Sequence, residues 1–288
     1  MWMETVACKG PYNFDSVLDR LSMDPIISLN KSEKVIKVPV LIGNKPNVIT
    51  VKAVGTMHKP AFEVSSKDES MKEAALKKVG SIFRWDYPLQ DVAKHFHQTN
   101  IAKIFKQHEG TPLVLEFDLY NCLVKCIIHQ QLNLAFAHTL TARFVKQFGY
   151  EVDNVWFYPK PEAVARLKYE ELRELQFSQR KAEYLIDTSK LIADGILNLD
   201  ELAKQSDEEI LKTLIKIRGV GPWTVQNMLL SGLGRPNLFP KADIGVQRAI
   251  QQHFQLEAKP TNDEMDQYSE QWSPYLSYAT LYLWRSIE

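Results

Sequence analysis

The segment Leu214-Ile-Lys-Ile-Arg-Gly-Val-Gly-Pro-Trp-Thr224 decides the fold of this chain. Leu214 and Ile217 are three residues apart, as on one buried face of a helix. Gly219 and Gly221 then end that helix at a turn that needs unusual backbone angles or close approach. Pro222 suits the first turn of a new helix, because its missing N–H would have no partner there. The segment therefore predicts two helices joined by a tight Gly-Val-Gly hairpin.

The backbone N–H groups of such a hairpin, next to the positive end of the second helix, form an anion site. It would bind one phosphate and read no base, so it suits an anchor for the DNA backbone. The residues of this predicted anchor are Gly219, Val220, Gly221 and Thr224. The plainer interpretation, and the commoner one for a bare Gly-x-Gly, is a glycine-capped helix followed by another helix.

The longer sequence favours the DNA interpretation. A loop rich in Gly and Pro runs from Ser231 to Ala242, and Asp243 follows it. The hairpin, the loop and this Asp together resemble the helix-hairpin-helix (HhH-GPD) superfamily of DNA base-excision glycosylases, and its AlkA-type 3-methyladenine DNA glycosylases in particular. The resemblance is specific in residues 122–143, 214–248 and 272–284 and looser in residues 1–110. It implies that Asp243 is the catalytic residue.

A carboxylate at Asp243 has a clear chemical use. Cleaving a base from deoxyribose develops positive charge on the sugar. A carboxylate beneath the sugar stabilises that charge and can orient or deprotonate the attacking water. Asp243 also precedes a predicted helix that begins at Ile244, so the alternative role is a helix N-cap. Both roles can coexist in one side chain.

Trp223 stands where glycosylases that also cut the strand carry a Lys, which attacks the sugar as a Schiff-base nucleophile. Trp cannot do this, so the resemblance implies a monofunctional enzyme that uses water. Trp223 is instead a predicted wall of a base pocket, because an aromatic face attracts an electron-poor or cationic alkylated purine. The resemblance implies the same role for Trp284, which matches a pocket tryptophan of the AlkA type. Asn227 departs from the family, whose AlkA-type members can have an aromatic residue there. Core packing is the alternative for each Trp, and Trp272 and Tyr278 are assigned to packing.

The segment Ile127-Ile-His-Gln-Gln-Leu-Asn133 carries a further resemblance. In this superfamily the turn between two helices here pushes a side chain into the duplex, filling the place of the flipped nucleotide. By position, that wedge is Gln131. A polar turn between helices is the alternative. His129 is interpreted as a structural histidine without a chemical role.

Composition excludes several classes of protein. The chain has 288 residues, 45% of them hydrophobic, and no net charge. It has no apolar run long enough to span a membrane, and because residues 1–4 lack a basic stretch and an apolar core, we expect no secretory signal. The few cysteines, Cys8, Cys122 and Cys126, favour a reducing compartment, so a cytoplasmic, nucleoid-associated protein of bacterial type is the expectation. A monomer is the default, because the sequence does not fix the oligomeric state. No set of His, Cys and Asp residues has zinc-site spacing, and no cofactor is implied. The alternative is a monovalent cation, held by the hairpin carbonyls when DNA is bound.

Charge is nevertheless uneven along the chain. Residues 211–253 contain six basic side chains and one acidic side chain, Asp243. This imbalance predicts a local basic face for phosphate contacts. A solvated helix surface is the alternative for each of these charges.

The two parts of the chain differ in pattern. Residues 35–42, 47–54 and 61–65 are β-rich, and helical periodicity is found at 14–21 and 71–83. From about residue 91 the pattern is helical. We therefore expect an α+β fold: an N-terminal antiparallel sheet with helices (TBP-like) over residues 1–110, and an all-α region over residues 111–288. The helices predicted from residue 89 onward cover 89–97, 100–107, 116–129, 133–148, 161–166, 169–174, 178–193, 206–217, 223–231, 243–254, 262–271 and 274–285.

Together these features predict a monofunctional DNA glycosylase. It would flip alkylated purines of the 3-methyladenine and 7-methylguanine type out of double-stranded DNA and hydrolyse their bond to the sugar. Three alternatives remain open: a DNA-binding protein that kept the hairpin and lost catalysis, a glycosylase of the same fold for oxidised or deaminated bases, and a helical protein-interaction module.

Overall fold

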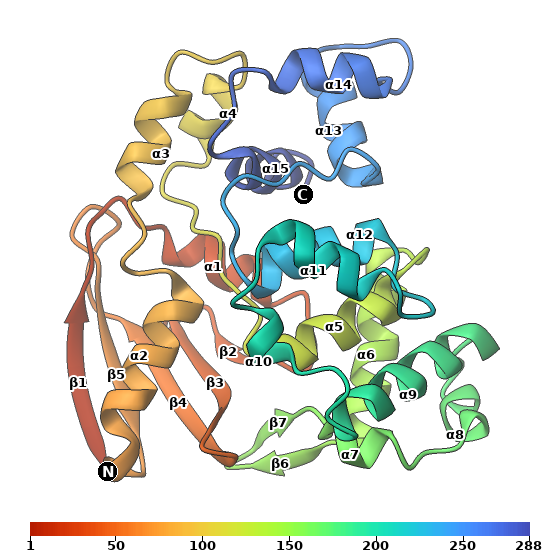
Figure 1. Ribbon diagram of the computed structural model, residues 1–288. Coiled ribbons are helices and arrows are strands. Elements are labelled where there is room, and N and C mark those ends of the chain that lie inside the picture. The colour runs from red at the N-terminus through yellow and green to blue at the C-terminus, as the bar shows by residue number, and fades with distance from the viewer.

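The computed structural model describes all residues from Met1 to Glu288. Its N-terminal part is one antiparallel sheet with the strand order β1-β5-β4-β3-β2 (Figure 1). The three predicted strands are confirmed, while β1 and β2 were not predicted. The strands are β1 (Trp2–Ala7), β2 (Ser28–Asn30), β3 (Val35–Ile42), β4 (Lys45–Ala53) and β5 (Ala61–Ser66).

The sheet follows from the alternation of buried and partly buried residues along its strands and from the tight turn between β3 and β4. In β3, Ile36, Val38 and Val40 are buried on one face, while the residues between them are only partly buried. Gly43 and Asn44 both have positive φ, and Ile42 pairs directly with Lys45. This is the two-residue hairpin geometry that matches the twist of the flanking strands. The turn is therefore tighter than the sequence suggested, and β4 begins two residues before the predicted strand.

Two helices pack on the buried face of the sheet. They are α1 (Phe14–Leu21), which lies between β1 and β2 in the chain, and α2 (Lys72–Phe83), which follows a short 3-10 turn after β5. Phe14 and Val17 of α1 share a hydrophobic core with Val79 and Phe83 of α2 and with the sheet. The apolar stripe of each amphipathic helix thus closes one side of the core.

The remainder of the chain is helical, as predicted, apart from a small β-hairpin. The helices are α3 (Leu89–Phe96), α4 (Ala102–Gln107), α5 (Leu119–His129), α6 (Leu134–Phe148), α7 (Pro161–Val164), α8 (Tyr169–Glu174), α9 (Gln179–Ala193), α10 (Leu199–Leu202), α11 (Asp207–Leu214), α12 (Pro222–Asn227), α13 (Ile244–His253), α14 (Asn262–Ser269) and α15 (Leu276–Arg285). The hairpin pairs β6 (Tyr150–Val152) with β7 (Val155–Phe157), and a π-helical turn, η2 (Met228–Gly232), follows α12. Neither the hairpin nor α10 was predicted.

Two hydrophobic cores organise these elements. One lies among α5 to α12, and it includes the buried faces of α5 and α9, represented by Leu123 and Ile186. The other joins both ends of the chain, because the sheet and α1 to α4 share it with α13 to α15. The last helices therefore return to the N-terminal part, and Figure 1 shows α15 next to α4 and above α1. The α+β fold is confirmed, and the division at residue 110 stays a prediction.

No helix is both long enough and apolar enough to cross a membrane.

Candidate active site

The turn between α11 and α12 has the expected hairpin form, and its two glycines differ. Gly219 has φ +89°, and a Cβ built on it would lie 2.1 Å from the ring of Tyr184 in α9. Gly219 is therefore required by its backbone conformation and by close approach inside the protein. Gly221 has an ordinary φ of −98°, and no heavy atom lies within 4 Å of a Cβ built there. Within the protein, Gly221 therefore needs neither unusual backbone angles nor close approach.

The hairpin presents free amides. The N–H groups of Gly219 and Gly221 have no acceptor within the protein, whereas that of Val220 donates to the Ile217 carbonyl at 3.0 Å. The Val220 side chain is buried against the second core. Because α12 begins at Pro222, the free amides lie at the positive end of a helix, which is the arrangement an anion needs.

Thr224 supports this turn from inside. It is only 1% exposed, and its Oγ1 accepts a hydrogen bond of 2.9 Å from Gln130 Nε2. The same Gln130 nitrogen donates to the Gly219 carbonyl at 2.8 Å. The Thr224 hydroxyl is thus engaged within the protein, which argues against its predicted contact with DNA. Gln130, which sequence reasoning gave no separate role, ties the end of α5 to the hairpin.

Asp243 is the N-cap of α13. Its Oδ1 accepts a hydrogen bond of 3.0 Å from the backbone N–H of Val246. This satisfies one of the orphan donors in the first turn of the helix. The structural role weighed for Asp243 is therefore present.

Two indoles also donate to the same carboxylate. Trp284 Nε1 donates to Oδ1 at 2.9 Å, and Trp223 Nε1 donates to Oδ2 at 3.1 Å. Three predicted site residues thus come together from α12, α13 and α15. A Cβ built on Gly245 would lie 3.1 Å from the indole of Trp284, so the small residue at this position lets the ring approach the helix start.

A family model for HhH-GPD superfamily base excision DNA repair proteins matches residues 124–274. The chain belongs to the HhH-GPD superfamily. It is 55% identical to a putative DNA-3-methyladenine glycosylase, YfjP, of Bacillus subtilis, over the full length of both chains.

Two further comparisons concern a second sequence relative and the fold. A DNA-3-methyladenine glycosylase of Bacillus subtilis is 38% identical over 59% of this chain and 57% of its own. The fold matches a 3-methyladenine DNA-glycosylase from Archaeoglobus fulgidus with a TM-score of 0.87 at 22% identity, covering 99% of this chain and 97% of that one. In this HhH-GPD protein, the family model includes the hairpin and Asp243, while Trp284 lies beyond its end.

The predicted wedge residue, Gln131, lies in the exposed turn between α5 and α6. Its φ of +56° is unusual for a residue other than glycine, so the turn holds its backbone in a left-handed conformation. Lys181 of α9 fixes the preceding turn, because its Nζ donates to the carbonyls of Ile127, Ile128 and Gln130. Gln131 is thus an exposed residue in a turn that Lys181 holds in place.

His129 fits its structural interpretation. Burial, followed by the nearby positive charge of Lys125, lowers the pKa of His129 to about 3. The ring is therefore neutral at physiological pH, and its Nε2 lies 3.1 Å from Thr141 Oγ1. Trp272 and Tyr278 are fully buried, as expected of packing residues. Asn227 donates to the Trp223 carbonyl at 2.9 Å and so helps to fix the start of α12.

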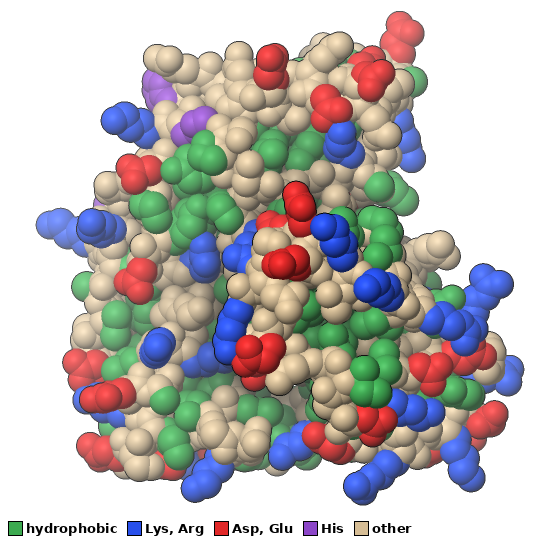
Figure 2. All heavy atoms as spheres, viewed as in Figure 1, with side chains coloured by type: hydrophobic (Ala, Val, Ile, Leu, Met, Phe, Trp, Pro, Cys, Tyr) green, Lys and Arg blue, Asp and Glu red, His purple; other side chains and the backbone are tan.

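The basic face expected over residues 211–253 is largely neutralised. Four of its six cations form ion pairs with acids outside that segment, and only Lys216 and Arg248 have no such partner. Figure 2 accordingly shows acidic and basic side chains interspersed rather than one field of positive charge. The paired residues are Lys212 with Glu208, Arg218 with Glu183, Arg235 with Asp207 and Lys241 with Asp266. This favours DNA binding through local contacts rather than through net charge.

The predicted monovalent cation has potential ligands in the hairpin. The carbonyls of Ile215 and Val220 accept no hydrogen bond within the protein, whereas the Gly219 carbonyl is engaged by Gln130. Free carbonyl oxygens are suitable ligands for a weakly bound cation, and occupation would add positive charge beside a phosphate.

Proposed function

We propose that this HhH-GPD protein is a monofunctional DNA glycosylase. It flips alkylated purines, of the 3-methyladenine and 7-methylguanine type, out of duplex DNA and hydrolyses the bond between base and sugar, leaving an abasic site. The names of its relatives in Bacillus subtilis support the substrate class. The observation that carries the proposal is the Asp243 carboxylate, held by two indoles and a helix start and joined to the hairpin helix through Trp223.

The hydrogen bonds at Asp243 leave room for its chemical role. A carboxylate has about four acceptor positions, two on each oxygen. Oδ1 accepts two N–H groups and Oδ2 accepts one. One acceptor position of Oδ2 therefore remains for an attacking water. The fixed negative charge would also stabilise the positive charge that develops on the deoxyribose.

The other residues have supporting roles in this proposal. The free amides of Gly219 and Gly221 bind one backbone phosphate, which positions the strand without reading sequence. Gln131 enters the duplex where the nucleotide has left, and its amide can hydrogen-bond the orphaned partner base. The faces of Trp223 and Trp284 contact the flipped base, since their N–H edges are engaged by Asp243.

Release of free base from duplexes with single alkylated purines tests the proposal. We expect wild-type protein to release base, and Asp243→Asn to abolish release while keeping affinity for a duplex with an abasic-site analogue. The amide of Asn would face the indole N–H of Trp223 donor to donor, so the thermal unfolding of the variant must be measured as well. Asp266→Asn, which removes an exposed acid paired with Lys241, is the matched control and should retain full activity. Turnover by a folded Asp243→Asn variant would remove Asp243 from the mechanism.

Reduction with borohydride during the reaction tests the absence of lyase activity. A lyase forms a Schiff base between an amine and the sugar, which borohydride traps as a covalent protein–DNA adduct. Trp223 occupies the position of that amine, so we expect no adduct. Formation of an adduct would show that another amine attacks the sugar.

A further inference from the structure

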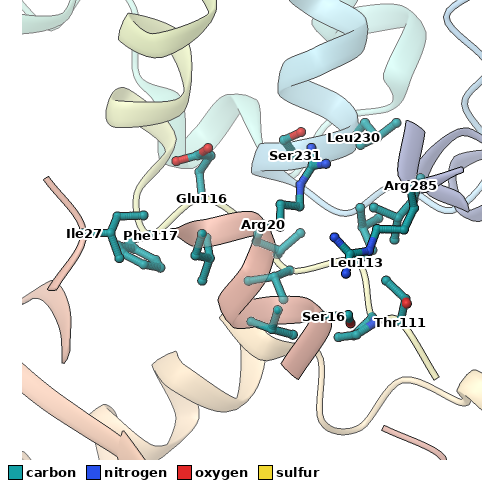
Figure 3. A pocket seen from close by; sticks show the side chains of 16 residues that line it. Ser16, Arg20, Ile27, Thr111, Leu113, Glu116, Phe117, Leu230, Ser231 and Arg285 are labelled. Atoms are coloured by element: carbon teal, nitrogen blue, oxygen red, sulfur yellow. The ribbon is translucent and has the colours of Figure 1, made fainter. Parts of the chain in front are cut away.

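Lys181 of α9 is a half-buried cation without an acidic partner. Cations elsewhere are often paired: Arg20 and Arg285, which line a cavity of about 60 Å³ (Figure 3), both form ion pairs with Glu288. The acidic residues of α9, by contrast, pair with cations other than Lys181. Burial lowers the pKa of Lys181 to about 8, so the ammonium is still the major form at pH 7.

The Lys181 ammonium is bound to the end of α5. It donates to the carbonyls of Ile127 at 3.1 Å, Ile128 at 2.6 Å and Gln130 at 2.7 Å. An ammonium has three N–H donors, so all of them are used on the backbone. The last carbonyls of a helix lack partners within the helix, and the helix dipole favours a positive charge beside them. These three carbonyls form a cage that Lys181 fills.

The bond to the Gln130 carbonyl bears directly on Gln131. The peptide unit between the two residues is planar, so the direction of the Gln130 carbonyl fixes that of the Gln131 N–H. Gln131 has a φ of +56°, which is unfavourable for a residue other than glycine. A hydrogen bond from a charged donor is strong enough to offset this cost. Lys181 therefore stabilises the backbone conformation that carries the Gln131 side chain.

The same helix also supports the phosphate hairpin. Tyr184 lies three residues after Lys181 and so on the same side of α9, and its ring packs so closely on Gly219 that a Cβ built there would lie 2.1 Å from it. Gln130 joins the two supports, because its carbonyl accepts from Lys181 while its amide donates to the Gly219 carbonyl. The turn of the wedge and the hairpin are thus held in fixed relation by one helix.

We propose that Lys181 is a positioning residue for base flipping, which holds the turn of Gln131 in fixed relation to the hairpin, so that the wedge enters the duplex when the hairpin binds a phosphate. This inference rests on the proposed function, because it concerns how the same site obtains its base. Flipping costs least when a base is already unpaired. The contribution of Lys181 should therefore be large only where a base pair must be opened.

Single-turnover release of 7-methylguanine from two duplexes tests this role. In one duplex the lesion lies opposite cytosine, and in the other it lies opposite an abasic-site analogue, where no pair must be broken. In Lys181→Met, we expect release from the paired duplex to slow about tenfold or more, the loss typical of one charged hydrogen bond. Release from the unpaired duplex should change much less. Damage to the fold would instead lower both rates by the same factor.

Chemical rescue tests the carbonyl cage itself. Lys181→Ala lacks the last three carbons and the nitrogen of the side chain, which propylammonium supplies. We expect propylammonium to raise the rate of release from the paired duplex at pH 7. Tetramethylammonium at the same concentration has the charge but no N–H, so it should not. Lys181→Gln keeps two N–H donors without charge, and this milder variant should show the same selective loss at smaller size.

Two further variants separate this role from general effects. Lys190→Met removes an exposed cation of the same helix, paired with Asp187, and it should leave the ratio of the two release rates unchanged. In a protein that already carries Gln131→Ala, Lys181→Met should change that ratio little, since the wedge through which Lys181 acts is absent.

The outcomes distinguish this inference from the proposed function. Equal losses on the two duplexes, no rescue by propylammonium, or a full additional loss in the Gln131→Ala protein would overturn the role of Lys181, while wild-type release still supports the glycosylase. Failure of the wild-type protein to release base from either duplex would overturn the proposed function, and this inference with it.

Discussion

The substitution Gly219→Ala should damage the protein before DNA is bound, whereas Gly221→Ala should damage only the binding. At Gly219 the new Cβ would lie 2.1 to 2.6 Å from three ring atoms of Tyr184, and φ is +89°. A clash of this kind costs about 1–3 kcal/mol, and a left-handed conformation costs an alanine about 1–2 kcal/mol more. We therefore expect a loss of about 2–5 kcal/mol in the free energy of unfolding. At Gly221 the new Cβ meets nothing, so we expect a change within about 0.5 kcal/mol.

DNA affinity should show a large loss in Gly221→Ala, the variant whose stability is expected to change little. In Gly221→Ala the methyl group would stand where a phosphate must approach the free amides. Loss of one charged hydrogen bond costs about 1.5–3 kcal/mol, which is about tenfold or more in Kd. The loss should be equal for all sequences, since a phosphate contact carries no sequence information.

Thermal unfolding and fluorescence anisotropy with undamaged and abasic-analogue duplexes measure the two effects. For a protein of this size, the loss in Gly219→Ala corresponds to a Tm lower by about 5–15 °C. The double variant Gly219→Ala/Tyr184→Ala should recover the part of the loss that comes from the ring, which a double-mutant cycle would report as coupling. If Gly221→Ala lowers Tm as much as Gly219→Ala, or binds DNA normally, the separation of the two roles is refuted.

Three further outcomes are expected. Gln130→Ala should lower Tm and weaken DNA binding, because it removes two hydrogen bonds to the hairpin, each worth about 1 kcal/mol. Gln131→Ala should keep the wild-type Tm but slow base release, and 2-aminopurine fluorescence should report less nucleotide flipping; equal melting losses in both variants would contradict this assignment. His129 has a pKa of about 3 in the folded protein against about 6.5 when unfolded, so its contribution to stability is complete above pH 6.5 and declines as the pH falls toward 3. Urea unfolding between pH 7.5 and 5 should therefore depend less steeply on pH in His129→Gln, and an unchanged slope would contradict this.

Local patterns were sufficient for several parts of the fold and of the site. The hairpin was predictable because glycine spacing and Pro222 act within a few residues. The N-cap at Asp243 followed from its position before a helical pattern. The hairpin of β6 and β7 could also have been found, because Asp153 and Asn154 both have positive φ and their residue types are typical of such a turn.

Other parts depend on contacts between distant segments, which no local pattern reports. Gln130 and Gln131 are neighbours with the same side chain, yet Gln130 is bound to the hairpin and Gln131 is exposed in the turn. The difference comes from the backbone at the end of α5, where Gln131 has a positive φ and Gln130 does not. The ion pairs that neutralise the basic side chains of residues 211–253 could not be predicted from the sequence either. Their acidic partners lie in helices that only the tertiary structure brings close.

The two tryptophans show most clearly what the tertiary structure adds. As pocket residues predicted from sequence, Trp223 and Trp284 are simply aromatic surfaces for a base. In the structure the indole N–H of each tryptophan, its only hydrogen-bond donor, donates to Asp243. Neither side chain can therefore donate a hydrogen bond to a base, so both must recognise it by stacking. Stacking alone separates damaged purines poorly, since every base has a π-face. Discrimination among uncharged bases must therefore come from polar groups beyond the two indoles, whereas the indole faces by themselves still favour a cationic alkylated purine.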